Sequence, residues 1–305
     1  MSVELDLEPT ELRRFIAVAE ERSFRRAAER LGIAQPPLSR TIAQLEGKLR
    51  TRLLHRTTRH VSLTPAGVVL LEQARHVLDA VSAAARRTAR AGLPRAHLAV
   101  ALKPGNGGRL LRRLVDHYER SGSPVRVEVV VSGWGEQTAM LADGRADVAF
   151  LRGPITAPGI DAEPLFTEPR CVALAAAHPL SGRRVLRRGD LARDPVPVWP
   201  AASAELAAYR AAVDRHEDAP RGPVVRDASQ LLEAVALGQG IAFVPASSAT
   251  LYARHDVKYV RMAGISASTL YVAWPDACRS KEVARFVRLA VEVASSLGGD
   301  AAELA

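Results

Sequence analysis

The sequence predicts two different folds in one chain: an N-terminal all-α winged helix-turn-helix domain with a long linker helix, and a C-terminal α/β domain. Three observations support this prediction. Residues 10–49 hold three short amphipathic patterns separated by tight turns, and residues 65–90 hold one long helical pattern. Beyond residue 95, strand and helix patterns alternate. A chain of 305 residues is long enough for two or three domains.

The composition is that of an ordinary globular protein, with 48% hydrophobic and 25% charged residues. No apolar run approaches the ~20 residues that a membrane helix needs. The start of the chain lacks the basic and then apolar order of a signal peptide. We therefore expect a cytoplasmic protein with no membrane partner. The two cysteines, Cys171 and Cys278, are too few for a metal cluster or a dense disulfide framework, and we expect neither metal nor cofactor.

The positive charge is concentrated near the N-terminus. The chain carries a net charge of +9, and residues 22–62 hold ten basic side chains against two acidic ones. Such a concentration favours a polyanionic partner, with nucleic acid ahead of a membrane surface. The alternative is a solvated face in an arginine-rich protein.

The first two helices have recognisable start and stop signals. Thr10 is a candidate cap for a helix that runs to about residue 21. Ser23 is a candidate cap for the next helix, and Gly32 is expected to end it. Small residues, Ala27 and Ala28, are placed where two helices must approach closely. The pattern predicts a helix, a short turn and a second helix.

The third helix is predicted to begin at Pro36 or Pro37, since proline is favourable at the first helical position. Its apolar stripe leaves Ser39 and Arg40 on another face, at the front of the helix. In a helix-turn-helix, the second helix reads the major groove with its N-terminal residues. A hydroxyl and a guanidinium there can bond phosphates or base edges. This places Arg40 in contact with DNA.

A basic hairpin and a long helix follow. Residues 53–54 and 61–63 can pair as short strands, and the arginines between them can reach phosphates or the minor groove, as in a wing. A solvated turn is the alternative. Thr64 caps a helix to about residue 90 whose apolar residues repeat at threes and fours. Such a seam favours a partner helix and a homodimer, although packing on the chain's own C-terminal domain is an alternative. The predicted DNA contacts are Ser23, Arg25, Gln35, Pro36, Pro37, Ser39, Arg40, Arg56 and Arg59.

This order of elements carries a family resemblance. The run from ELRRF to LTPAG resembles the N-terminal domain of LysR-type transcriptional regulators over about sixty residues. It includes SF-x-x-AA-x-x-L, AQPPLSR, QLE and L-T-x-AG. The visible departure is Leu54-His55, where the family usually has phenylalanine and a charged residue. The resemblance implies a homodimer, assembled further into a homotetramer, that binds operator DNA and responds to a small effector.

The C-terminal residues read as βαβαβ over HLAVALK, GGRLLRRLVDHYER, VRVEVVV, GEQTAMLADG and ADVAFL, which predicts a parallel sheet covered on both faces. By resemblance, this part is an effector-binding domain of two subdomains hinged like periplasmic binding proteins. The expected boundaries are 1–64 for the DNA-binding domain, 65–91 for the linker helix and 95–300 for the effector domain. Subdomain I takes residues 95–168 and 268–300, and subdomain II takes 169–267. Gly92-Leu93-Pro94 is the expected hinge between domains.

Candidate effector contacts lie at strand ends. The glycine-rich loop LKPGNGGRLL suits an anion, although a permissive turn is an equal alternative. Arg152 ends a strand, where open α/β sheets bind ligands, and in relatives an arginine there pairs with aromatic carboxylates; a surface arginine is the alternative. Trp134 replaces a serine or threonine of relatives, and either stacks on a ring or fills the pocket. The predicted effector contacts are Lys103, Pro104, Asn106, Gly133, Trp134, Arg152, Trp199 and Pro200, and the predicted effector is an anion, possibly an aromatic carboxylate.

Other readings of the chain are weaker. Phe150 and Phe243 are expected in the core, and Cys171 is expected to be a buried thiol, not a redox sensor. We do not expect an enzymatic function, because the sequence has no nucleophile elbow, metal-spaced histidines or paired carboxylates. An architectural DNA binder with a C-terminal domain that no longer senses a ligand remains the main alternative.

Overall fold

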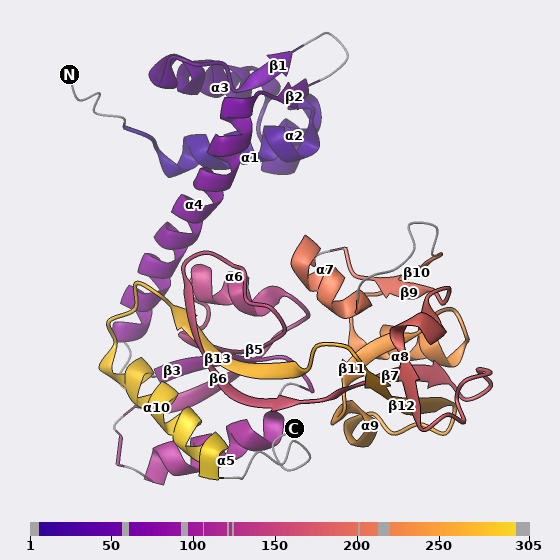
Figure 1. Cartoon of the computed structure of the whole chain (residues 1–305). Helices are drawn as coiled ribbons and strands as arrows, with labels where there is room; N and C mark the ends of the chain where they lie inside the picture. The colour runs from indigo at the N-terminus through magenta and orange to yellow at the C-terminus, as the bar shows by residue number, and fades with distance from the viewer. Residues whose placement is uncertain are drawn as a thin grey trace. The chain divides into compact units, whose positions relative to one another are not determined.

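The computed structural model describes residues 6–56, 61–92, 97–105, 107–120, 122–123, 125–200, 202–212 and 220–296. The chain divides into an N-terminal unit that ends at Ala89 and a C-terminal unit that begins at Arg90. Figure 1 shows the elements of each unit. Leu93 and Pro94, two residues of the expected hinge, lie outside the described residues.

The N-terminal unit begins with three helices, α1 (Pro9–Glu21), α2 (Phe24–Leu31) and α3 (Gln35–Leu49). The predicted cap of α1 is wrong. Glu8 takes that position, and its N–H donates to Oε2 of Glu11 at 3.0 Å. Ser23 caps α2 as predicted, because its Oγ accepts the N–H of Arg26 at 3.4 Å. Gly32 ends α2 with a left-handed φ of 65°. The third helix begins one residue earlier than predicted, at Gln35, so the two prolines follow its first residue.

A two-stranded wing follows, with β1 (Leu54–Arg56) antiparallel to β2 (Val61–Leu63). Oε1 of Glu46 accepts the N–H groups of Leu53 at 2.9 Å and Leu54 at 3.2 Å, which ties the start of the wing to α3. Thr64 caps α4 (Pro65–Ala91) as predicted, because its Oγ1 accepts the N–H of Gly67 at 3.0 Å. The core of this unit joins α1, α2, α3 and the wing around fully buried apolar side chains, among them Phe15, Val18, Leu38, Ile42 and Leu45.

The first lobe of the C-terminal unit is built on a five-stranded sheet of order β4-β3-β5-β13-β6. Its strands are β3 (His97–Leu102), β4 (Arg126–Val131), β5 (Val148–Arg152), β6 (Ile160–Glu168) and β13 (Ser268–Pro275). The strands β3, β4 and β5 are parallel, as predicted. The complete sheet is mixed, because β13, which lies outside the predicted βαβαβ run, pairs antiparallel with both β5 and β6.

Helices cover both faces of this sheet. On one face α5 (Gly108–Arg120) lies beside α10 (Lys281–Ser296), and on the other lies α6 (Glu136–Ala142) (Figure 1). Successive strand residues alternate between the faces: Val148 and Phe150 pack under α5 and α10, whereas Ala149 and Leu151 pack with α6. Burial on both faces explains the nearly continuous apolar runs of β3 and β5.

The second lobe holds a four-stranded sheet of order β11-β7-β12-β8. Its strands are β7 (Arg170–Ala175), β8 (Val185–Arg187), β11 (Ala242–Pro245) and β12 (Val257–Ala263). A short 3-10 helix, η1 (Arg188–Leu191), follows β8, and β9 (Val196–Val198) pairs in parallel with β10 (Arg221–Val224). The helices are α7 (Ala204–Ala211), α8 (Ala228–Ala236) and α9 (Ser248–Leu251).

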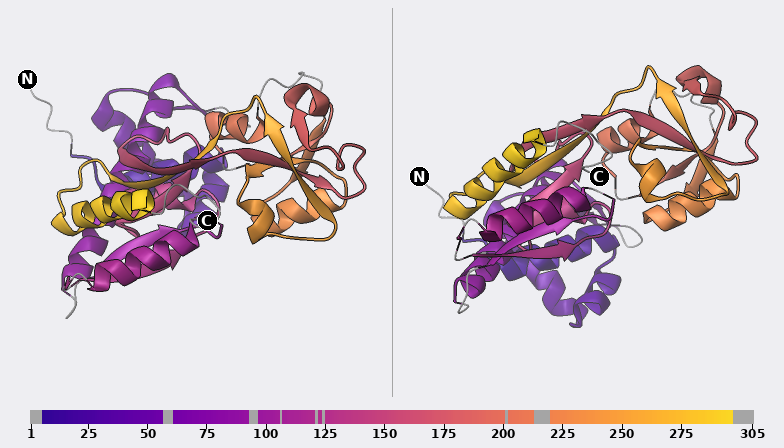
Figure 2. Two further views of the ribbon diagram at one scale, coloured as in Figure 1. Left: turned by 60° about the horizontal axis from the view of Figure 1, so that its bottom comes forward. Right: turned by 90° about the horizontal axis from the view of Figure 1, so that it is seen from below.

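The chain crosses between the two lobes twice. One crossing joins β6 to β7, and the other joins β12 to β13 (Figure 2). Glu168 ends β6 and Ser268 begins β13, so these two residues pair at the point where both crossings leave the first sheet. Any rotation of one lobe against the other must therefore act on this short region.

Candidate functional site

The front of α3 is exposed. Gln35, Pro36 and Arg40 are exposed, Pro37 and Ser39 are half-buried, and the apolar stripe between them is buried. Among the described residues, the guanidinium of Arg40 has no hydrogen-bond or ion-pair partner. The sequence analysis placed all five residues on this face, and the structure brings them together there.

Contacts behind α3 fix its orientation. Arg14 Nη1 donates to Thr41 Oγ1 at 2.6 Å, and Lys48 Nζ lies 2.8 Å from a carboxylate oxygen of Glu11. The other predicted DNA contacts differ in whether their side chains already have a partner within the protein. The hydroxyl of Ser23 caps α2, and Arg25 pairs with Glu29 at 2.9 Å on the surface. Arg59 and the side chain of Arg56 lie outside the described residues.

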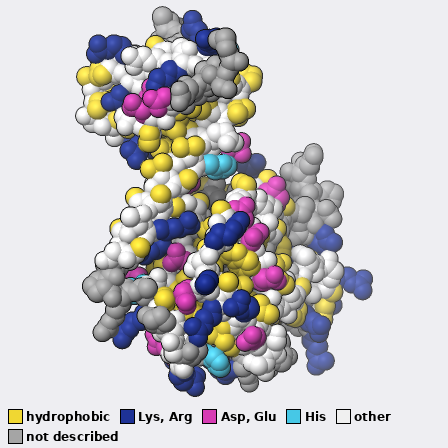
Figure 3. Space-filling view, turned by 90° about the vertical axis from the view of Figure 1, so that its left-hand side faces the viewer, with side chains coloured by type: hydrophobic (Ala, Val, Ile, Leu, Met, Phe, Trp, Pro, Cys, Tyr) yellow, Lys and Arg dark blue, Asp and Glu magenta, His cyan; other side chains and the backbone are white. Residues whose placement is uncertain are grey.

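The helix α4 exposes several apolar side chains. Val68, Val69, Val77 and Val81 are 40–61% exposed. Figure 3 shows hydrophobic side chains along this part of the surface. Val77 and Val81 lie one turn apart on the same face of α4, so they offer an exposed apolar pair to a partner helix.

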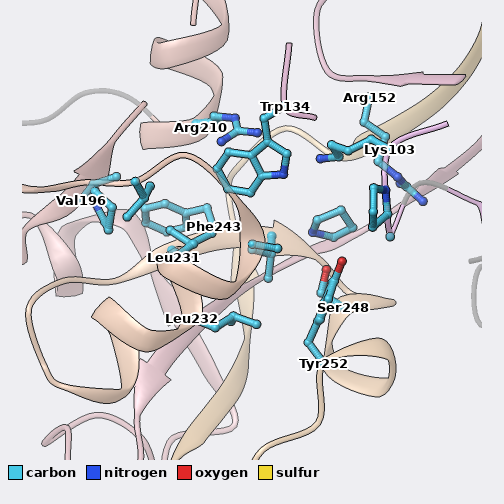
Figure 4. A pocket seen from close by; sticks show the side chains of 18 residues that line it. Lys103, Trp134, Arg152, Val196, Arg210, Leu231, Leu232, Phe243, Ser248 and Tyr252 are labelled. Atoms are coloured by element: carbon cyan, nitrogen blue, oxygen red, sulfur yellow. The ribbon is translucent and has the colours of Figure 1, made fainter. Parts of the chain in front are cut away.

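Between the two lobes of the C-terminal unit lies a cavity of about 120 Å³, here called the inner chamber. The side chains of Lys103, Trp134, Arg152 and Arg210 lie on one side of it (Figure 4). On the opposite side lie apolar side chains of the second lobe, Val196, Leu231, Leu232 and Phe243. A larger outer chamber of about 430 Å³ adjoins the inner one and is lined by residues that include Gln137, Thr138, Ile155, Trp199 and Ser203.

Three cationic side chains, Lys103, Arg152 and Arg210, line both chambers. Burial, followed by the charges of Arg210 and Arg152, lowers the pKa of Lys103 to about 7. Burial also lowers the pKa of Arg210 to about 10, which leaves it charged at neutral pH. Among the described residues, neither Lys103 nor Arg210 forms an ion pair with an acid, so this part of the cleft carries a net positive charge.

Arg152 differs from the other two cations because it has a protein carboxylate as partner. Its Nη1 lies 2.7 Å from Oε1 of Glu168, whose side chain is fully buried, and 3.3 Å from Oγ of Ser268. The same carboxylate accepts the N–H of Ser247 at 2.7 Å and its hydroxyl at 3.0 Å. The Nε and Nη2 atoms of Arg152 are buried with no hydrogen-bond partner in the described part of the chain.

Two tryptophans hold Arg210. Its guanidinium carbon lies 4.2 Å from the ring centre of Trp134 and 4.6 Å from that of Trp199. The two indoles meet edge to face, with centroids 5.9 Å apart and an interplanar angle of 76°. Trp134 belongs to the first lobe, whereas Arg210 and Trp199 belong to the second. The three side chains therefore form a contact across the cleft and separate the two chambers.

Three glycines of the first lobe accept large side chains of the second. A Cβ atom on Gly135 would lie 2.5 Å from Trp199, and one on Gly105 would lie 2.5 Å from the hydroxyl of Tyr252. A Cβ on Gly153 would lie 3.3 Å from the ring of Tyr209. All three glycines have positive φ, at 76°, 81° and 101° respectively. The lobes thus meet where the backbone of the first lobe has no side chain.

The remaining predicted effector contacts differ in whether they line a chamber. Pro104 lines the inner chamber, and Trp199 lines the outer one. Gly133 lines neither, and its N–H donates to Oε2 of Glu136 at 2.8 Å. Pro200 is exposed and also lines neither chamber. Asn106 lies outside the described residues.

The predictions for core residues are confirmed in two cases out of three. Phe150 is fully buried, and burial raises the pKa of the Cys171 thiol to about 12. Phe243 is not fully enclosed, because its ring lines the inner chamber. The sequence analysis missed Arg210 and Glu168, because no local pattern marks an arginine in an alanine-rich helix or a glutamate at the end of a strand.

Comparison with known proteins covers both units. Residues 9–68 match the family described as "Bacterial regulatory helix-turn-helix protein, lysR family", and residues 91–295 match "LysR substrate binding domain". The transcriptional regulator BenM of Acinetobacter baylyi is 32% identical over 273 residues, which cover 88% of this chain and 90% of BenM. AlsR of Bacillus subtilis is 32% identical over 275 residues, which cover 87% of this chain and 89% of AlsR.

Solved structures agree. The LysR family regulator CbnR is 26% identical with a TM-score of 0.57, covering 94% of this chain and 99% of that chain. A full-length BenM variant is 29% identical with a TM-score of 0.55, covering 96% and 97%. None of the helices in the described part of the chain has the length and apolar character needed to cross a membrane. The chain therefore belongs to the LysR family of transcriptional regulators, with a helix-turn-helix DNA-binding domain and an effector-binding domain, and is a regulator, not an enzyme.

Proposed function

We propose that this regulator responds to a small carboxylate with a compact apolar body, bound in the inner chamber. The observation that supports the proposal is the placement of three cationic side chains against one acid at the edge of an apolar cavity. Ligand sites combine apolar walls with a few polar groups that fix orientation. A cavity of 150 Å³ holds a benzene ring, so about 120 Å³ suits one small ring or a short branched chain.

A thermal-shift screen of the full-length protein tests this proposal. We expect benzoate and short branched carboxylates to raise the melting temperature, and benzamide, which has the shape of benzoate without its charge, to have no effect. A ligand at 100 times its dissociation constant adds about 2.7 kcal/mol of stability. If no carboxylate shifts the transition, the carboxylate proposal is wrong and the architectural alternative gains support.

We further propose that α3 reads the operator through Arg40, supported by the lack of a partner for this exposed guanidinium among the described residues. A solved structure of the relative CbnR, 27% identical with a TM-score of 0.50, is a complex with target DNA. Arg40→Ala should weaken operator binding by roughly 1–3 kcal/mol at fixed salt. Arg112→Ala is the matched control, because Arg112 is an exposed arginine of α5 in the C-terminal unit. Equal affinities of both variants for the operator would remove Arg40 from this role.

The exposed valines of α4 support a homodimer through this helix, which two dimers would extend to a homotetramer. Val77→Glu and Val81→Glu should lower the molar mass measured by light scattering. An unchanged mass in the double variant would place the interface elsewhere.

A further inference from the structure

We propose that Arg210 is the residue that receives the carboxylate of the effector, so that the ligand is held by a guanidinium fixed between two indoles. This inference rests on the proposed carboxylate effector and names its anchor. It moves the main contact from Arg152, which the sequence favoured, to a residue of α7.

The three cations of the cleft are not equivalent. Arg152 already shares its charge with Glu168 at 2.7 Å, so a second carboxylate would gain less from it. Lys103 is a compact ammonium, and its low pKa means that it is only partly charged at neutral pH. Arg210 stays charged, and among the described residues it has no carboxylate partner. Coulomb attraction therefore favours Arg210 as the partner of an incoming anion.

The two tryptophans prepare Arg210 for this role. Ring faces at 4.2 and 4.6 Å stabilise the cation and restrict its rotamers before any ligand arrives. These contacts leave the N–H groups of Arg210 without a carboxylate partner among the described residues, and a guanidinium can form paired hydrogen bonds with a carboxylate. A side chain that is already ordered loses less entropy on binding.

The position of Arg210 also connects ligand binding to the lobes. The residue lines both chambers, and it contacts Trp134 of the first lobe from a helix of the second. A carboxylate bound to Arg210 must therefore sit at the contact between the lobes. Its capture would alter the surroundings of Trp134 and Trp199 directly.

Tryptophan fluorescence provides the test. The chain has three tryptophans, and Trp274→Phe leaves only Trp134 and Trp199 as emitters. We would titrate formate, 2-methylpropanoate and benzoate into the full-length protein in this background, with benzamide as the neutral control. We would compare Arg210→Met and Arg210→Lys with Arg112→Met, an exposed arginine of α5 outside both chambers. Far-UV circular dichroism without ligand checks that each variant is folded.

The expected result is a saturable fluorescence change with at least one carboxylate. Arg210→Met should raise the dissociation constant tenfold or more, Arg210→Lys should raise it less, and Arg112→Met should leave it unchanged. If Arg210→Met binds the same carboxylate as tightly as the parent, Arg210 is not the anchor, although the carboxylate proposal stands. If the parent responds to none of the carboxylates, both proposals are overturned.

Discussion

Replacing Glu168 by glutamine tests how the cleft and the crossing between the lobes depend on each other. The side chain of Glu168 is fully buried, that of its partner Arg152 is 6% exposed, and the two lie 2.7 Å apart. The N–H and the hydroxyl of Ser247 donate to different oxygens of Glu168, so glutamine keeps an acceptor for the N–H but presents an NH₂ group on the other side and removes the negative charge. The guanidinium of Arg152 would then be buried without compensation.

The expected loss is about 3–5 kcal/mol in the free energy of unfolding, the usual effect of removing one member of a buried ion pair. Urea denaturation followed by tryptophan fluorescence measures it, because all three tryptophans, Trp134, Trp199 and Trp274, lie in the C-terminal unit. With a slope of ~2–3 kcal/mol per molar urea, the midpoint should fall by about 1–2 M.

Two comparisons make this prediction refutable. The double variant Arg152→Met/Glu168→Gln removes both charges, and it should lose less stability than the glutamine variant alone. Glu233→Gln is the matched control, because Glu233 pairs with Arg254 at 3.0 Å with 58% of its side chain exposed. Such surface pairs contribute about 0–1 kcal/mol. The reasoning fails if Glu168→Gln loses no more stability than Glu233→Gln, or if the double variant loses as much stability as Glu168→Gln alone.

Three further predictions concern single side chains. The pKa of Lys103 in the folded state, about 7, is below its ordinary value of 10.5, so the unfolded chain binds more protons between these pH values. Stability in urea should therefore rise with pH above about 7, and Lys103→Met should remove that part of the slope; equal slopes would refute this. Thr64→Ala should destabilise the start of α4 by ~1 kcal/mol, seen as faster amide exchange in its first turn that Thr64→Ser restores. Iodoacetamide at pH 8 should label half-buried Cys278 much faster than Cys171, whose pKa is raised to about 12 by burial, and equal labelling in peptide masses would contradict the burial.

Local signals predicted the N-terminal unit well. Ser23, Gly32 and Thr64 act where their chemistry suggested, because caps and left-handed turns depend on neighbours within three or four residues. The prediction that Thr10 caps α1 is wrong for a reason that is also local. The carboxylate of Glu11 accepts the N–H of Glu8, and α1 begins before Thr10, at Pro9. Glu8, the residue that takes the capping position, lies two residues before Thr10 in the sequence.

Long-range pairing was harder to predict. The strand β6 went unrecognised because Pro164 interrupts its pattern and acids follow its apolar residues, which suits an edge strand. The antiparallel direction of β13 depends on a partner more than a hundred residues away, and no local pattern encodes it. The residues of the candidate site likewise fall into those with a local signal in the sequence and those without one. Lys103 and Arg152 can be predicted from the sequence because they follow or end strands. The role of Arg210 cannot, because it depends on contacts with Trp134 and Trp199 that only the folded chain brings together.

The three glycines that receive side chains of the second lobe have a consequence for how such regulators diversify. At Gly105, Gly135 and Gly153 the fit between the lobes depends on the backbone of the first lobe. All three have a φ that is unfavourable for other residues, and a Cβ atom would clash at Gly105 and Gly135 and be crowded at Gly153. Apart from Trp199, Leu206 and Tyr252, which contact these glycines, the side chains that face the chambers carry no such constraint. A descendant of this gene can therefore acquire a new inducer by exchanging chamber side chains, while inheriting unchanged the surface on which its lobes close.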